Sequence, residues 1–196
     1  GTQMAQAQIG CDRACLTGYV DAWFTGLHAN NTNGVPLAAN VKISQNGQLV
    51  SLKDTFWDSA TETVYRWDIV NQRLGDTGTE AVVKNSDGTM TMVAVRLKVL
   101  NGAISEIETI KANKGDANGL WGPEQLVDRP LSGFLTLSIA EASRDSYYRL
   151  IAAAESYWRA FQTNGTPVYH AADLLPDAVR FENGLPPIYT MLSTGA

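Results

Sequence analysis

Residues 80–111, EAVVKNSDGTMTMVAVRLKVLNGAISEIETIK, decide the fold of this chain. The pairs Asp87-Gly88 and Asn101-Gly102 each stand between segments in which side chains alternate in polarity. Asp-Gly and Asn-Gly in that setting are the sequence signals of tight β-hairpin turns. The stretch therefore predicts three consecutive antiparallel strands joined by two short turns.

The second turn sets a register that can be worked out along both strands. With Asn101 and Gly102 as the two loop residues, Val99 lies opposite Ile104. Successive side chains point to opposite faces of a strand. Arg96 and Lys98 then lie on one face. The other face carries two carboxylates among six aliphatic side chains: Val93, Val95, Leu97, Val99, Ile104, Glu106, Glu108 and Ile110.

This placement of the two carboxylates has two interpretations. If the aliphatic face lines a closed cavity, Glu106 or Glu108 is a desolvated carboxylate with a raised pKa, and such a group can transfer protons near neutral pH. If a β-bulge shifts the register by one residue, both carboxylates pair with Arg96 and Lys98 on a solvated face. From this stretch alone the second interpretation is favoured, and both stay open; the first becomes the favoured one only inside a curved sheet whose concave face needs an aliphatic lining.

The composition of the chain is ordinary for a globular protein. It has 196 residues, 44% of them hydrophobic and 18% charged, with a net charge of -5. No basic run and no apolar run of about 18 residues occurs, so we expect neither a nucleic-acid partner nor a membrane-spanning helix. Residues 1–10 read as a mature or tagged N-terminus, which leaves both a secreted and a cytoplasmic location open.

The two cysteines, Cys11 and Cys15, are four residues apart. On one helix face they have poor geometry for a disulfide, whereas a bridge is feasible if Cys11 precedes the helix. A zinc site needs about four ligands, and the two histidines, His28 and His170, lie far from the cysteines in sequence. We therefore expect no metal site. The glycosylation motifs at Asn30 and Asn164 are as many as chance predicts.

Two amphipathic helices are expected, over residues 11–29 and 141–162, because their apolar residues recur at three- and four-residue spacing. Between the first helix and residue 80, the sequence predicts a hairpin around Asn46-Gly47, a short helix within residues 52–63 and a strand over residues 64–70. In that strand Arg66 and Asp68 share a face. The pair is either a surface ion pair of little energetic value or, in a closed cavity, an acid–base candidate.

A Gly- and Asn-rich stretch after Lys111 marks a boundary. We expect an α+β domain over residues 11–111, a linker over 112–140 and a helix–strand extension over 141–196. The second helix repeats the apolar pattern of the first, and AVRFENG (178–184) lines up with VKISQNG (41–47). The extension is thus either a truncated repeat or a chance similarity between two amphipathic helices.

Residues 11–111 resemble a nuclear-transport-factor-2-like (SnoaL-like) domain. The resemblance is carried by CDRACL (11–16), PLAANVKISQNG (36–47), the Trp57 segment and RLKVLNGAISEIETI (96–110). These segments are similar to a largely uncharacterised fungal and bacterial family, in which many members carry a further segment like SYYRLIAAAESYWRAF (146–161). The resemblance implies a cone-like, curved antiparallel sheet wrapped around helices and enclosing a mainly apolar pocket. Members often dimerise through the open sheet, so a homodimer is expected.

Such folds host cofactor-free isomerases, dehydratases, epoxide hydrolases, cyclases and carbon–carbon lyases, besides binding proteins, so the fold alone does not choose among them. The epoxide-hydrolase members use an Asp-Arg-Asp constellation. In this chain Arg66 and Asp68 could supply two of its members, and Asp54 or Asp58 could supply the third. His28 is poorly placed for the dehydratase chemistry.

The leading hypothesis is a cofactor-independent lyase, isomerase or cyclase that acts on a small, mainly apolar, natural-product-like molecule by acid/base catalysis. Glu106 or Glu108 would be the general base, with Tyr65, Asp68 and Arg96 as further catalytic candidates; Tyr65, Tyr19 or Arg96 would stabilise negative charge on oxygen. Substrate contacts are expected from six aromatic residues: Tyr19, Trp23, Trp57, Trp67, Tyr147 and Trp158. The alternative is a non-catalytic small-molecule-binding or protein-interaction module.

Overall fold

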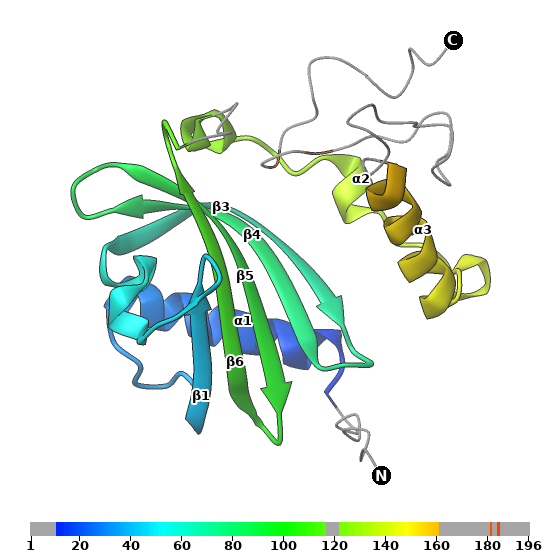
Figure 1. Ribbon diagram of the computed structural model, residues 1–196, viewed down its shortest axis with the longest axis horizontal. Helices are drawn as coiled ribbons and strands as arrows, with labels where there is room; N and C mark the ends of the chain where they lie inside the picture. The colour runs from blue at the N-terminus through cyan, green and yellow to red at the C-terminus, as the bar shows by residue number, and fades with distance from the viewer. Residues whose placement is uncertain (1–10, 117–121, 161–180, 182–183, 185–196) are drawn as a thin grey trace. The chain divides into compact units, whose positions relative to one another are not determined.

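The computed structural model describes residues 11–116, 122–160, 181 and 184. The chain divides into two compact units, Gly1–Leu131 and Ser132–Ala196. The first unit has the expected α+β composition (Figure 1) and contains α1 (Arg13–Ala29), β1 (Leu37–Gln45), β2 (Gln48–Leu49), η1 (Leu52–Asp54), η2 (Phe56–Asp58), β3 (Ala60–Asn71), β4 (Asp76–Asn85), β5 (Met90–Leu100), β6 (Ala103–Asn113) and η3 (Pro123–Leu126). The second unit contains α2 (Gly133–Thr136), η4 (Glu141–Ser143) and α3 (Tyr147–Ala160).

Helix α1 ends at Ala29 as predicted and begins at Arg13, two residues after the predicted start. The Asp12 side chain accepts a hydrogen bond from the Cys15 backbone N–H and so caps the first turn. Asn30 ends the helix in the left-handed conformation, with φ of 48°. Cys11 precedes the first helical residue and forms a disulfide with Cys15. Of the two alternatives for the cysteines, the bridged one is therefore confirmed.

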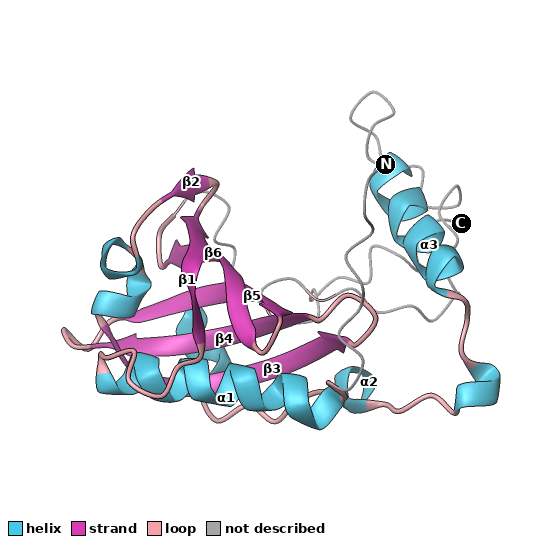
Figure 2. Cartoon of the chain, turned by 90° about the horizontal axis from the view of Figure 1, so that it is seen from below, coloured by secondary structure: helices cyan, strands magenta, loops and turns pink. Residues whose placement is uncertain are grey.

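The six strands form one curved sheet in the order β2-β1-β6-β5-β4-β3. All neighbouring strands are antiparallel except β1 and β6, which run parallel, so the expected curved antiparallel sheet contains one parallel pair and is mixed. The parallel pair arises because β6 ends the β3–β6 meander beside β1, a strand distant in sequence. Helix α1 lies along one face of this sheet (Figure 2). No helix within the described residues is long and apolar enough to cross a membrane.

The face of the sheet that packs against α1, called here the helix face, carries the core. Val93, Val95 and Leu97 of β5 are buried on it as predicted. They belong to one cluster with the α1 stripe and with two aromatic side chains of η2: Val20, Trp23, Phe24, Leu27, Phe56 and Trp57. The predicted short helix within residues 52–63 consists of the two 3-10 turns η1 and η2, because β3 already begins at Ala60.

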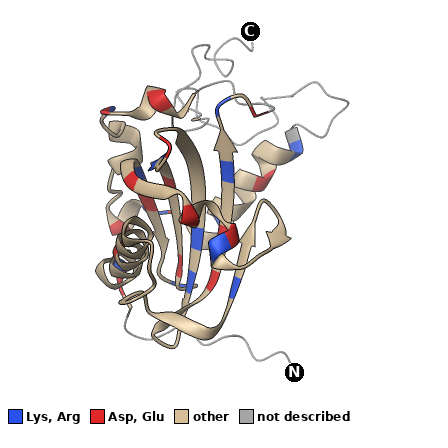
Figure 3. Cartoon of the chain, turned by 90° about the vertical axis from the view of Figure 1, so that its left-hand side faces the viewer, with Lys and Arg blue, Asp and Glu red and all other residues tan. Residues whose placement is uncertain are grey.

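The opposite face, called here the open face, carries side chains that alternate with the core residues. At one end of this face η3 contacts β4 and β5, and Val82, Met92 and Leu126 are buried there. Farther along, ion pairs join Arg96 and Lys98 to carboxylates on this face, and charged residues of both signs lie on neighbouring strands (Figure 3). The open face therefore has an apolar end and a charged end.

Of the two interpretations of Glu106 and Glu108, the one with a β-bulge is confirmed, and the placement on the helix face is wrong. Val99 lies opposite Ile104 as expected, but the register shifts between Lys98 and Val99, with Ser105 as the extra residue of a β-bulge. Beyond the bulge, Lys98 pairs with Glu106 and Arg96 with Glu108. The bulge leaves both carboxylates on the open face, where they have cationic partners and avoid the cost of burying an unpaired charge. Ile110 moves to the open face with them and is 60% exposed.

The second unit is described in part. Within the predicted helix over residues 141–162, the structure has the 3-10 turn η4 and the helix α3. Residues 178–184, which would form the second copy of the proposed repeat, lie almost wholly outside the described residues, as does the motif at Asn164. The truncated repeat therefore stays a prediction.

Candidate functional site

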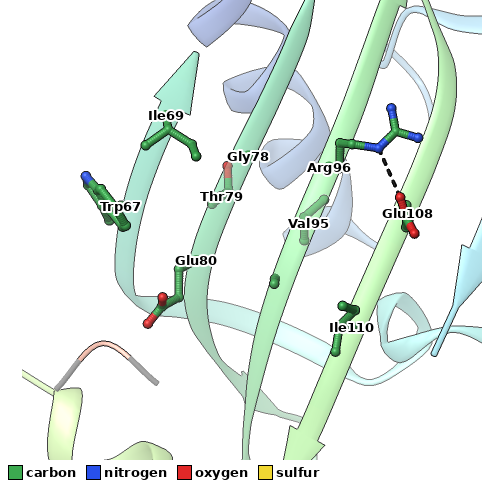
Figure 4. A pocket seen from close by; sticks show the side chains of 10 residues that line it. Trp67, Ile69, Gly78, Thr79, Glu80, Val95, Arg96, Glu108 and Ile110 are labelled. Atoms are coloured by element: carbon green, nitrogen blue, oxygen red, sulfur yellow. Dashed lines mark hydrogen bonds and ion pairs between the residues drawn. The ribbon is translucent and has the colours of Figure 1, made fainter. Parts of the chain in front are cut away.

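A cavity of about 360 Å³ opens on the open face of the sheet (Figure 4). All of its lining residues belong to strands β3 to β6 of the first unit: Trp67, Ile69, Gly78, Thr79, Glu80, Ala94, Val95, Arg96, Glu108 and Ile110. Its volume lies in the range of small-molecule sites. We call it the open-face pocket.

The strand register determines the shape of the pocket. Trp67 and Ile69 project from the edge strand β3 on one side, and Ile110 projects from β6 on the other (Figure 4). Between them, Gly78 and Ala94 leave the floor low. A Cβ atom at Gly78 would lie 3.0 Å from Cγ1 of Ile69, so the glycine makes room for that side chain. The result is a trough with apolar walls on a floor of small residues.

Glu80 is the one carboxylate on the floor of this trough. It pairs with Trp67 on β3 and with Ala94 on β5, so apolar residues flank it across both strands. Its atom Oε1 is buried and has no hydrogen-bond partner among the described residues. Burial raises the pKa of Glu80 because desolvation disfavours the ionised form. Glu80 thus has the property that the sequence led us to expect of Glu106 or Glu108.

Tyr65 lies next to Glu80 on the open face, two residues before Trp67 along β3. Its side chain is buried. Burial raises the pKa of Tyr65, the nearby charge of Glu80 raises it further, and Arg129 opposes the shift. The phenol is therefore held in its neutral, hydrogen-donating form close to the carboxylate.

Arg96 lies at the other end of the pocket and is held by three carboxylates. Its Nε donates to Oε2 of Glu108 at 3.0 Å, its Nη1 to Oδ1 of Asp76 at 3.1 Å and its Nη2 to Oε2 of Glu106 at 2.7 Å. Burial lowers the pKa of Arg96, but these hydrogen bonds and charges outweigh burial and raise it overall. The hydrogen bond from Arg96 lowers the pKa of Glu106. Glu106 is therefore a carboxylate that stays ionised.

A second polar cluster lies between α1 and the helix face. Arg66 donates to both oxygens of Asp68, at 3.0 and 2.6 Å, and pairs with Oδ1 of Asp21 at 2.8 Å. Thr79 donates to Asp68 at 2.7 Å, and the Arg66 guanidinium stacks 5.0 Å above the Phe24 ring. Arg66 and Asp68 share a face as predicted, and the third group of this Asp-Arg-Asp arrangement is Asp21 rather than Asp54 or Asp58.

The structure brings together some of the predicted site residues and separates others. Arg96, Glu108 and Trp67 line the open-face pocket, with Tyr65 beside it. Glu106 lines a neighbouring cavity of about 250 Å³. The others lie elsewhere: Trp23 and Trp57 are core residues and Tyr19 packs against them, Asp68 is on the helix face, and Tyr147 and Trp158 belong to the second unit.

Glu80 was not among the residues singled out from the sequence. The available signal was its position in β4. Once Trp67 and Ile69 are placed on one face of β3, the partner of Trp67 in the next strand shares that face. That partner is Glu80, a carboxylate in an apolar surrounding.

Among known proteins, the matches to this chain are solved structures. No family model and no curated protein matches the chain. Among solved structures, the chain is similar to a candidate polyketide cyclase from Xanthomonas campestris pv. campestris, at 17% identity and a TM-score of 0.42, covering 50% of this chain and 90% of that one. A candidate ketosteroid isomerase from Kribbella flavida matches at 13% identity and a TM-score of 0.41, covering 67% and 95%. A de novo designed protein with a curved β-sheet matches at 16% identity and a TM-score of 0.44, covering 54% and 91%.

These likenesses concern the fold and not an activity. One long helix, a β1–β2 hairpin and a four-strand meander form a curved, unclosed mixed sheet, which is the architecture expected from the sequence resemblance. The first unit therefore has the curved α+β architecture that this resemblance implies.

Proposed function

We propose that the protein is a cofactor-independent enzyme that moves a proton on a small, mainly apolar molecule bound in the open-face pocket, with Glu80 as the general base. One observation carries the proposal: Glu80 lies on the floor of an apolar trough, and its buried Oε1 has no hydrogen-bond partner among the described residues. A carboxylate with a raised pKa is a stronger base than one in water and can act near neutral pH. Lyase, isomerase and cyclase reactions all use such a step.

The neighbouring groups fit supporting roles in this reaction. Glu80 would take a proton from carbon, and the electron pair released would move onto an electronegative atom of the substrate. Tyr65 is neutral and could donate a hydrogen bond to that atom. Arg96 is fixed by its three carboxylates, so it would orient a polar group at the far end of the substrate. Trp67, Ile69 and Ile110 would exclude water from the reacting atoms.

The proposal can be tested with 5-nitrobenzisoxazole, an apolar bicyclic probe. When a base removes its carbon-bound proton, the N–O bond breaks and a coloured cyanophenolate forms. The full chain should accelerate this reaction, and the rate should rise with pH through the raised pKa of Glu80, because the base must be ionised. The variant Glu80→Gln should lose about 100-fold or more of the rate.

Glu62→Gln is the matched control, since Glu62 is an exposed glutamate on β3 and should leave the rate unchanged. A wild-type rate no higher than that of acetate at the same concentration would overturn the proposal, as would full activity of Glu80→Gln. If Glu106→Gln alone abolished the rate, the base would be the residue first predicted from the sequence. Probe binding without turnover would favour a non-catalytic binding module.

A further inference from the structure

The charges that line the open-face pocket are unequally compensated. Arg96 is hydrogen-bonded to three carboxylates, and Lys98, its neighbour on the same face, contacts Asp76 at 3.6 Å. Glu80 has no cation in contact among the described residues, and its Oε1 has no hydrogen-bond partner there. Among the charged residues that line the pocket, Glu80 is therefore the one without an opposite charge in contact within the described part of the chain, and its charge is negative.

We propose that the open-face pocket binds apolar organic cations, namely small hydrophobic molecules with a protonated amine that pairs with Glu80. This inference rests on the pocket of the proposed function but not on its proton-transfer chemistry. A ligand of this class would also inhibit that chemistry competitively, because its ammonium group would occupy the base.

The three possible ligand charges can be compared at the floor of the trough. A neutral ligand without a donor leaves the buried Glu80 oxygen unpartnered. An anion meets the charges of Glu80 and Glu108, while the arginine that could attract it is already held. An ammonium group forms a charge-assisted hydrogen bond with Glu80 where the local dielectric is low, which strengthens the interaction.

The walls favour the rest of such a ligand. Trp67 lines the trough next to Glu80, and an indole ring attracts a cation through its π face. Ile69 and Ile110 offer aliphatic contact on opposite sides (Figure 4). A volume of about 360 Å³ accommodates a bicyclic hydrocarbon with one polar substituent.

The experiment compares three ligands of one shape and three charges: 2-aminoindane, indan-2-ol and indane-2-carboxylate. Each is titrated into the full chain at pH 7.5 and its dissociation constant is measured by calorimetry or by NMR chemical shifts. The amine should bind about tenfold tighter than the alcohol or better, and the carboxylate should bind most weakly. In Glu80→Gln the difference between amine and alcohol should collapse, whereas in Glu62→Gln it should persist.

Equal affinity for amine and alcohol, or tightest binding of the carboxylate, would overturn the inference. So would an amine preference that survives in Glu80→Gln. Failure here is distinguishable from failure of the proposed function. Benzisoxazole turnover without an amine preference leaves the enzyme proposal intact and overturns the binding inference. An amine preference without turnover leaves the binding inference intact and overturns the enzyme proposal.

Discussion

Replacing Glu80 by Gln should make the folded protein more stable at neutral pH, although it removes a proposed active-site group. Burial raises the pKa of Glu80 in the folded state above its value in the unfolded chain. Below the unfolded pKa, both states hold the proton and Glu80 has no net effect. As the pH rises above that value, the unfolded chain ionises first, so the folded state loses stability until its own raised pKa is passed. Above it, the penalty is constant.

The size of the effect follows from the shift in pKa. Each unit by which the pKa is raised corresponds to about 1.4 kcal/mol of destabilisation at neutral pH. Because Glu80 is only half-buried and Gln still leaves a polar atom in the trough, we expect Glu80→Gln to gain about 1 kcal/mol at pH 7. For a domain of this size that is a rise of roughly 3–6 °C in melting temperature. At pH 4 the gain should largely disappear.

Thermal unfolding followed by circular dichroism at pH 7 and pH 4 measures both values. Glu106→Gln is the matched control of opposite sign, since Arg96 lowers the pKa of Glu106. Its stabilisation is present above the unfolded pKa and is lost as the pH falls through the folded pKa. The Arg96 and Glu106 side chains are 38% and 41% exposed, so this control should lose no more than about 0.5 kcal/mol at pH 7. A lower melting temperature of Glu80→Gln at pH 7, or an equal rise at both pH values, would refute the reasoning.

Two further predictions concern the packing of α1. Gly26→Ala should destabilise the first unit by about 1–3 kcal/mol in urea unfolding, because a Cβ atom there would overlap Val35. Gly18→Ala, with nothing within 4 Å of its Cβ position, should instead stabilise it slightly, and equal effects of the two variants would contradict the packing argument. Arg66→Met should cost about 1–3 kcal/mol because it removes the bidentate partner of Asp68. An unchanged urea midpoint would show that this ion pair contributes nothing.

The strands and turns could be predicted from the sequence because they depend on local signals. Asn101-Gly102 forms the two-residue turn, and Val99 lies opposite Ile104 beside it. A bulge was one of the two interpretations of this hairpin, but no local signal in the sequence places it at Ser105. No glycine or proline marks its position. The bulge is favoured because it lets Glu106 and Glu108 reach Arg96 on one side of β6 while Ile104 and Ile107 stay in the core on the other side. These contacts come from other parts of the folded chain, so the local sequence does not decide on which face Glu106 and Glu108 lie.

The candidate site was predictable only in its parts. Arg96, Glu108 and Trp67 were named from their strands, and they meet in one pocket. Glu80 was missed because its neighbour in space, Trp67, comes from a strand whose register with β4 shifts twice between Ala60 and Tyr65. The expected homodimer, the cellular location and the substrate contacts of the second unit stay predictions.

The single extra residue at Ser105 also bears on how this gene can change. Deleting that one codon would remove the bulge but leave Lys98 opposite Glu106 and Arg96 opposite Glu108, so both carboxylates would stay on the open face. A point substitution at the same codon would keep both faces as they are. The hairpin should therefore tolerate the loss of one residue at the bulge as well as a substitution there, because neither change exchanges its faces.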